Sequence, residues 1–430
     1  MRGFDSARGV VCVELKVAIP PQRGAPQEEL PVLMVSRDNL RFSAIRKPVL
    51  LALLLPALWF VAHEGGPKLR QSDFVRYWVA ARLFLSGANP YSAPEVFQLE
   101  AQLHLGHRPL PLMFNPPTSL SVVAPFGLLP FPVAVAIWFL LQFVIVFVSS
   151  FWLWRIYRGP DQLRWLAIAL PGIFLPVAVA LLDCQMTPLA LLGLVAFLHF
   201  LDARAYMRAG VALALVALKP QLFVPLGCVL LLWCVRERNW RLLAGFAAAT
   251  AIFLSPVWLR PVLVSQYREI IPRIWDDAAP AWGGLLRAAF GYQRVWLQYL
   301  PVIPGLTWAV LYWRKHLSSW DWKQRLPMLL LVGFITAPYA WTYDEVILLP
   351  VFISVAVYVL AAPNPRLAGR VFRFYILINL VMFVLNIIGL RDVCFLWNVP
   401  VWLLAYMLLG QHSVMIGSPS NPLRARDVRP

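Results

Sequence analysis

Apolar stretches long enough to cross a membrane recur along the chain from residue 45 to residue 410. A transmembrane helix needs roughly 20 mostly apolar residues, and a window of that length finds about twelve stretches, some short or interrupted by proline. Composition agrees, because 60% of the residues are apolar and 14% charged, against roughly 45–50% and 25% in soluble domains. This excludes a soluble globule. The stretches lie near 45–63, 131–154, 165–182, 186–201, 207–218, 221–235, 242–258, 295–313, 327–342, 345–362, 371–389 and 394–410.

The sequence therefore predicts an all-α integral membrane protein, a polytopic bundle of about 10–13 transmembrane helices with amphipathic helices on its outer face. We expect a flexible cytoplasmic tail over 1–44, where prolines interrupt the chain, one transmembrane domain over 45–411, and a cytoplasmic tail over 412–430. The five cysteines form no CxxC pair and have no metal-ligand spacing to the six histidines. Neither a zinc site nor a disulfide framework is indicated.

The net charge of +17 comes from basic residues that concentrate in every second connection between apolar stretches. Connections rich in Lys and Arg face the cytoplasm, so both termini are predicted to be cytoplasmic. The segments 64–130 and 259–293 then lie on the outer face of the cell membrane. The same pattern removes nucleic acid as a partner, because the basic residues form no long block and no reader motif accompanies them.

The polar residues of the other connections gather on the predicted outer face. A charged side chain at membrane depth is costly and usually functional. Each has a plainer explanation: Asp73 can complement the dipole of a helix start, and Lys219 can extend towards the headgroups. These residues come from separate segments but share the same predicted side of the membrane, which favours one shared site instead. The acids are Asp73, Asp183 and Asp344, the cations Arg76 and Lys219, and the amides Asn115, Gln185 and Gln221.

The segment after residue 71 is predicted to begin an amphipathic helix. Ser72 is a suitable N-cap. The aromatic residues Phe74, Tyr77 and Trp78 suit a helix that lies in the headgroup layer. Cys184, in the tight connection between Asp183 and Gln185, is expected to react with an impermeant maleimide if solvent reaches the site.

Short motifs follow one another in a particular order along the outer connections: Asp73 with Tyr77 and Trp78, Asn89-Pro90-Tyr91, Asn115-Pro116-Pro117, Gln185, Lys219-Pro220-Gln221, Ser255-Pro256 and Tyr343-Asp344. In order, spacing and side of the membrane they resemble glycosyltransferase family 87, over roughly residues 45–400. These are membrane enzymes of the GT-C type with a polyprenyl-phosphate sugar, commonly the mannose form, as donor. The resemblance implies that Asp73 is the general base. Members commonly carry a His in the connection before the final Tyr-Asp, whereas this chain has Tyr339, Trp341 and Thr342 there. This difference affects the expected contact with the sugar or the acceptor.

The chemistry of such a transfer suggests roles for the other residues. A carboxylate takes the proton of the attacking hydroxyl, and cations stabilise the leaving phosphate; Arg76 and Lys219 are the first candidates, Arg268 and Arg273 the reserves. Hydrogen bonds to sugar hydroxyls are assigned to Asn115, Gln185, Gln221 and Asp344, beside Tyr77 and Tyr343. Ring stacking is assigned to Trp78, Trp275 and Trp341.

The donor class also bears on metals and stereochemistry. The chain has no Asp-x-Asp pair and no Gly-rich phosphate loop, and a polyprenyl monophosphate donor needs neither. We expect no cofactor, no metal, inversion at the anomeric carbon, and a lipid or glycan acceptor. The alternative is a transporter or flippase of lipid or glycan. That reading predicts charges in mid-span and two similar halves, and the sequence shows neither pattern.

Overall fold

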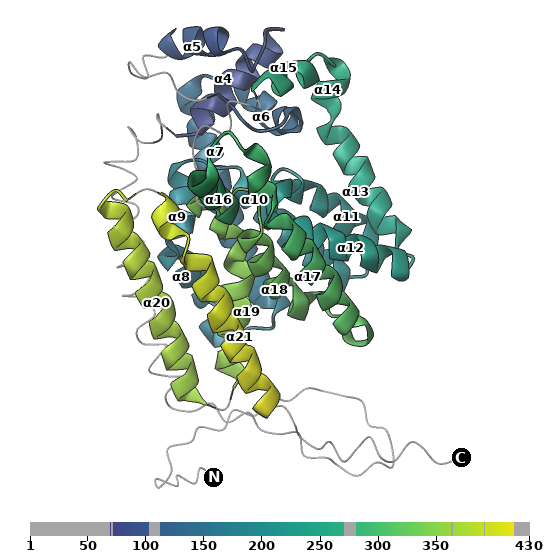
Figure 1. The fold of residues 1–430 in the computed structure, drawn as a ribbon, viewed down its shortest axis with the longest axis vertical. Coiled ribbons are helices and arrows are strands. Elements are labelled where there is room, and N and C mark those ends of the chain that lie inside the picture. The colour runs from purple at the N-terminus through teal and green to yellow at the C-terminus, as the bar shows by residue number, and fades with distance from the viewer. Residues whose placement is uncertain are drawn as a thin grey trace, which may run out of the picture. The chain divides into compact units, whose positions relative to one another are not determined.

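The computed structural model describes residues 69, 72–102, 112–270, 281–362, 364–390 and 392–416. All regular secondary structure in these residues is helical (Figure 1), as the sequence predicts. The chain divides into two compact units, 1–56 and 57–430, and the description below concerns the second. The predicted tail 1–44 and the predicted span 45–63 lie outside the described residues, as does 417–430.

Five helical segments of the described residues are long and apolar enough to cross a membrane. A sixth candidate is a broken pair with a bend of 62° between its halves: Asp161–Ile173, which contains α8 (Leu166–Ile173), and α9 (Leu175–Leu182). Pro171 and Pro176 flank the break, where they remove backbone donors from the helix. The five are α7 (Phe131–Ile156), η5 with α17 (Val295–Tyr299, Val302–Lys315), η7 with α19 (Thr342–Leu348, Leu349–Ala361), α20 (Pro365–Ile387) and η8 with α21 (Asp392–Phe395, Asn398–Ile416).

Four shorter apolar helices match further predicted stretches. They are α10 (Thr187–Asp202), α11 (Tyr206–Val216), α12 (Val224–Arg236) and α13 (Trp240–Phe253). The predicted break at Lys219-Pro220 is present as η3 (Pro220–Leu222), between α11 and α12. The predicted number of about twelve spans requires these shorter helices to cross as well. Glycines let α11 and α13 approach closely: Gly210 packs on the backbone of Leu242, and Gly245 on that of Met207.

The first predicted outer segment forms α4 (Phe74–Leu85), α5 (Ala93–Gln102), η1 (Pro117–Ser119) and α6 (Leu120–Gly127). The expectation that the aromatic residues of α4 face the headgroup layer is wrong. Phe74, Tyr77 and Trp78 are buried, because α4 packs against α6 and α7. The Phe74 and Trp138 rings lie 5.3 Å apart. Ser72 is not the N-cap either, since its hydroxyl donates to the Leu69 carbonyl and Asp73 occupies the N-cap position.

The second predicted outer segment and its flanks form α14 (Ser255–Leu259), α15 (Leu263–Ile270) and α16 (Trp282–Phe290). Figure 1 shows α14 and α15 beside α4 and α6. Three hydrogen bonds fix this neighbourhood. Arg260 donates to the carbonyls of Phe84 and Gly87, at 3.0 and 2.6 Å, and Tyr267 donates to the Phe114 carbonyl at 3.1 Å. Residues 271–280, with Arg273 and Trp275, lie outside the described residues.

The two ends of α10 have different surroundings. At its C-terminal end Asp202 pairs with Lys323 at 3.0 Å, next to the start of α18 (Trp322–Ile335). The Tyr157 hydroxyl, after α7, donates to the Lys323 carbonyl. Connections that are rich in Lys and Arg therefore meet at this end of α10. At its N-terminal end α10 begins with Thr187, two residues after Gln185. The basic connections and the polar outer set therefore lie at opposite ends of this helix.

Candidate functional site

The turn between α9 and α10 places Gln185. Gln185 N donates to the Ala180 carbonyl and Cys184 N to the Leu181 carbonyl, the pair of bonds that defines a Schellman motif. Glycine is usual at the left-handed position of this motif, but here Cys184 adopts it with a φ of 50°. The Trp138 indole donates to the Cys184 carbonyl at 2.8 Å. The turn is thereby held with the Gln185 side chain towards α4.

Asp73 is held from two sides. One carboxylate oxygen contacts Arg76 at 3.0 Å, and the other accepts a hydrogen bond from the Gln185 amide. The Gln185 carbonyl oxygen accepts in turn from the Tyr77 hydroxyl at 3.2 Å. The Asp73 and Arg76 side chains stay 22% and 23% exposed. The carboxylate is therefore oriented by neighbours and still accessible.

Asp344 is enclosed and has three partners. Its Oδ1 accepts from Thr187 at 2.6 Å and from the Lys219 ammonium at 2.8 Å. Its Oδ2 accepts from the Trp341 backbone at 3.1 Å. Asp344 has no exposed surface and Lys219 little, and Lys219 also lies over the Tyr343 ring at 4.9 Å. A buried charge needs such a set of partners.

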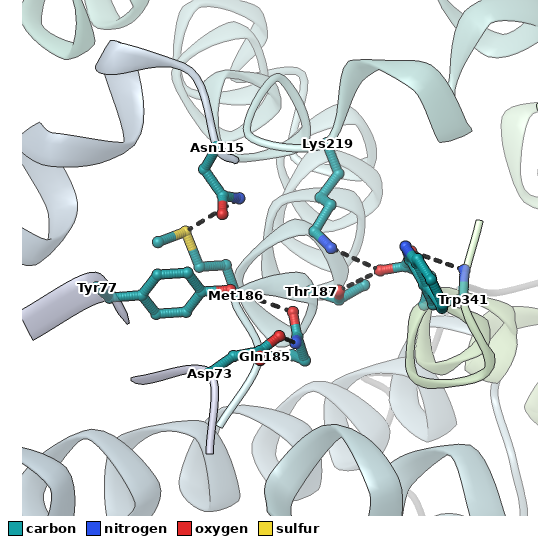
Figure 2. A network of polar contacts seen from close by, with 9 residues as sticks. Asp73, Tyr77, Asn115, Gln185, Met186, Thr187, Lys219 and Trp341 are labelled. Atoms are coloured by element: carbon teal, nitrogen blue, oxygen red, sulfur yellow. Dashed lines mark hydrogen bonds and ion pairs between the residues drawn. The ribbon is translucent and has the colours of Figure 1, made fainter. Parts of the chain in front are cut away.

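One turn of chain joins the two acids, and Figure 2 shows Asp73 together with the residues of this turn, Gln185, Met186 and Thr187. Gln185 binds Asp73 and Thr187 binds Asp344, and these two partners are two residues apart at the start of α10. The backbone N–H of Asp73 adds a bond to the Asp183 carbonyl at 3.1 Å. Segments far apart in sequence are thus assembled around residues 183–187.

The structure brings most of the predicted residues to this network. Asp73, Arg76, Tyr77, Gln185, Lys219, Tyr343 and Asp344 are joined by the contacts above, and Asn115 reaches the network through the Met186 sulfur, at 3.9 Å. Gln221 is half-buried in η3, and none of these contacts involves it. Thr187 was not predicted. A polar residue two positions after Gln185, at the first position of an apolar helix, is the signal that was available in the sequence.

One further expectation needs correction, and the condition attached to another, that solvent reaches Cys184, is not met. Trp78 is not free to stack on a sugar, because its ring is buried and its indole donates to the Leu129 carbonyl. Cys184 is not accessible: it is fully buried, and burial raises the pKa of its thiol to about 12. Burial also raises the pKa of Tyr77 well above its ordinary value, so this phenol stays a hydrogen-bond donor. No three His, Cys, Asp or Glu side chains converge as a metal site in the described part of the chain.

Comparison with known proteins gives one match. Residues 114–385, more than half of the chain, match the sequence profile of glycosyltransferase family 87. The matched range contains Asn115, Gln185, Lys219 and Asp344 and begins after Asp73. No curated protein and no solved structure matches this sequence.

Proposed function

We propose, since this chain belongs to glycosyltransferase family 87 and is thus a multi-pass membrane glycosyltransferase, that it transfers a hexose from a polyprenyl phosphate to a hydroxyl. The sugar is mannose, the acceptor is a lipid or glycan, and the reaction takes place on the outer face of the cell membrane. Family membership favours this enzyme over the transporter or flippase that the sequence left open.

The observation that carries the proposal is the geometry of Asp73. A general base must be fixed in direction and still reach a substrate proton. The Gln185 amide and Arg76 fix the two carboxylate oxygens, and the carboxylate remains partly exposed. Asp344, the other acid of the network, has both oxygens engaged and no exposed surface, so it suits a structural role.

The leaving phosphate is assigned to Arg76. Lys219, the other candidate, is committed to Asp344 and buried, whereas the Arg76 side chain is 23% exposed and a guanidinium has five N–H donors. A phosphate that binds Arg76 competes with Asp73 for it. The Asp73 oxygen released in this way becomes free to accept a proton, so donor binding prepares the base.

The transfer then proceeds in one displacement. The acceptor oxygen bonds to the anomeric carbon, its proton passes to Asp73, and the bond from that carbon to the phosphate oxygen breaks. The electron pair leaves with the polyprenyl phosphate, whose charge Arg76 stabilises. One in-line displacement inverts the anomeric configuration, and no metal or cofactor takes part in these steps. Asn115 donates to the sulfur of Met186, a residue of the turn 183–187, and is assigned a sugar hydroxyl.

Opposite ends of α10 support the outer location of this reaction. Asp202 and the basic connections lie at one end, and Gln185 and Thr187 at the other. With the basic end in the cytoplasm, Asp73 faces the outer side, where lipid-phosphate sugars are available and nucleotide sugars are not.

The test is transfer from radiolabelled polyprenyl-phosphate mannose by the purified protein, with membrane lipids and glycans as acceptors. We expect product from wild type, with inverted configuration, and a fall of at least 100-fold in kcat for Asp73→Asn, in line with the roughly 10²–10⁴-fold contribution of a general base. Asp161→Asn, in the connection after α7, is the matched control and should keep its rate. Absence of transfer from any polyprenyl-phosphate sugar, or full activity of Asp73→Asn, would contradict the proposal.

A further inference from the structure

The same backbone turn occurs twice among the connections that are rich in Lys and Arg. One copy joins α10 to α11, and the other joins α12 to α13. Arg204 and Arg238 take the left-handed position, with φ of 54° and 50°. The residues that follow them also match: Ala205 has φ −87° and ψ 62°, and Asn239 has φ −86° and ψ 60°. Glycine is the usual residue at the left-handed position, so each arginine strains the backbone there.

The two turns lie side by side because α11 and α13 pack together at their starts, as Figure 1 shows for the two helices. Gly210 of α11 lies on the backbone of Leu242, and Gly245 of α13 lies on that of Met207. All four residues belong to the first six of their helices. The absence of side chains at the two glycines therefore brings the two connections next to each other.

Each turn is followed by a second arginine in the first turn of its helix, Arg208 in α11 and Arg241 in α13. The four side chains are all exposed, and none forms an ion pair with a carboxylate of the described residues. We call this set the four-arginine surface: Arg204, Arg208, Arg238 and Arg241. The reaction proposed above, at the opposite end of α10, makes no use of it.

The positive charge of the four-arginine surface is not compensated. The acids nearest to the two turns in sequence are engaged with other cations: Asp202 pairs with Lys323 at 3.0 Å, and Glu237 lies 3.8 Å from Arg236. The start of a helix carries partial positive charge and favours acids over arginines. Two adjacent starts with two arginines each therefore repel one another, and a bound anion would remove this repulsion.

Apolar side chains are exposed directly beside the arginines. Met207 and Val211 lie on one stripe of α11, one helical turn apart, and Trp240 is the first residue of α13. All three are exposed. An indole is typical of the headgroup level of a membrane. A free anion would leave these apolar groups in water, whereas a lipid would cover them and supply the negative charge as well.

We infer that the four-arginine surface binds the headgroup phosphate of an anionic glycerophospholipid, in the leaflet that faces the basic connections. The acyl chains extend along Met207 and Val211. A guanidinium matches two phosphate oxygens with two parallel N–H groups, and basic sites between helices are a known form of lipid recognition. This inference is independent of the proposed reaction.

The test compares two phospholipids that differ in headgroup charge and share their acyl chains. Native mass spectrometry of the full-length protein measures the binding of dioleoyl-phosphatidylglycerol, with dioleoyl-phosphatidylcholine as the neutral reference. We expect wild type to bind the anionic lipid more tightly, by about ten-fold or more. Arg208→Gln combined with Arg241→Gln should remove most of this preference and leave the neutral lipid unaffected. Arg208→Lys combined with Arg241→Lys should keep most of it, because the charge remains.

Arg366→Gln combined with Arg370→Gln is the matched control. It removes two exposed positive charges from the start of α20, which Asn364 caps, and should bind the anionic lipid like wild type. The inference is wrong if wild type shows no preference for the anionic lipid, or if the preference survives Arg208→Gln with Arg241→Gln. An equal loss in the control would also overturn it, since any two basic residues would then serve.

The left-handed positions allow an independent measurement. Arg204→Gly combined with Arg238→Gly relieves the backbone strain, so the melting temperature in neutral detergent without lipid should equal or exceed that of wild type. The rise on addition of phosphatidylglycerol should be clearly smaller than in wild type. Arg158→Gly relieves the same strain after α7, where φ is 59°, and should keep the full rise. A full rise in the Arg204 and Arg238 variant would contradict the inference.

Two other ligands carry a phosphate and are separated by the same measurements. If inorganic phosphate alone raises the melting temperature of wild type as much as phosphatidylglycerol does, the surface binds a free anion and the lipid assignment falls. If farnesyl phosphate binds more tightly than phosphatidylglycerol and depends on Arg208 and Arg241, the surface belongs to the donor lipid, which also overturns the assignment. Failure of sugar transfer leaves all of these measurements unaffected.

Discussion

Gln185 donates a hydrogen bond to the carboxylate of Asp73, 112 residues away in sequence. The same amide accepts from Tyr77, one helical turn after Asp73. An amide that donates on one side and accepts on the other has one orientation that satisfies both contacts. The direction of the proposed base is therefore set by the turn between α9 and α10 and not by α4 alone.

Gln185→Leu removes the donor and keeps approximately the volume. We expect kcat to fall by about 10–100-fold, in the range for loss of one hydrogen bond to a charged group, with a smaller change in KM. The measurement is the steady-state transfer assay. Gln162→Leu, an exposed residue after α7, is the control. An unchanged kcat for Gln185→Leu would show that this amide does not position the base.

Lys219→Met leaves Asp344 buried without its cation. Removing one partner of a buried ion pair costs about 3–5 kcal/mol, so the variant should have a markedly lower melting temperature and yield. Asp344→Asn in the same chain should recover part of that loss, because the uncompensated charge is gone. Thermal unfolding of the single and double variants in detergent measures the coupling. Additive losses would show that Lys219 and Asp344 do not act as a pair.

Tyr77 gives a pH dependence with a definite sign. Its pKa is raised by burial, so its contribution to stability is complete below about pH 10, the ordinary value of the group, and decreases above it as the unfolded chain loses the proton. We expect the melting temperature to fall less steeply between pH 9 and 11 in Tyr77→Phe than in wild type. Parallel curves would show that the phenol titrates alike in both states.

Cysteine labelling tests the predicted topology. Cys394 is exposed and is the first residue of the predicted span 394–410, at the end predicted to face outwards, so an impermeant maleimide should label a variant that retains only this cysteine in intact cells. A variant with only Cys12 should be labelled after permeabilisation. Cys184, buried and with its thiol pKa raised to about 12, should react only in denaturant. Labelling of Cys12 in intact cells would reverse the orientation.

Much of the architecture follows from the sequence because lipid imposes a length rule on apolar helices. The stretch 131–154 becomes α7, and the break at Pro220 separates α11 from α12. The surroundings of an amphipathic helix obey no such rule. Phe74 and Trp78 suit the headgroup layer and a protein neighbour equally well, and only the presence of α6 and α7 decided between them.

The same division applies to the site. That Asp73, Gln185, Lys219 and Asp344 lie close together was predictable, since each lies in a connection and the basic pattern predicts the same side of the membrane for all four. Their partners were not. The pairing of Asp73 with Gln185, and of Asp344 with Thr187, depends on how the starts of α4, α10 and η7 meet. The turn before α10 was also hidden, because Cys184 takes the left-handed position in which a glycine would have indicated a Schellman motif.

By itself the sequence determined that this protein is built for a lipid environment, and it predicted which connections share a side of the membrane, because hydropathy and charge are properties of each segment alone. The tertiary structure decided which acid is free. Asp73 and Asp344 look alike in sequence, but Lys219 and Thr187 enclose the second and leave the first exposed to a substrate. That difference arises from contacts between segments, which no single segment contains.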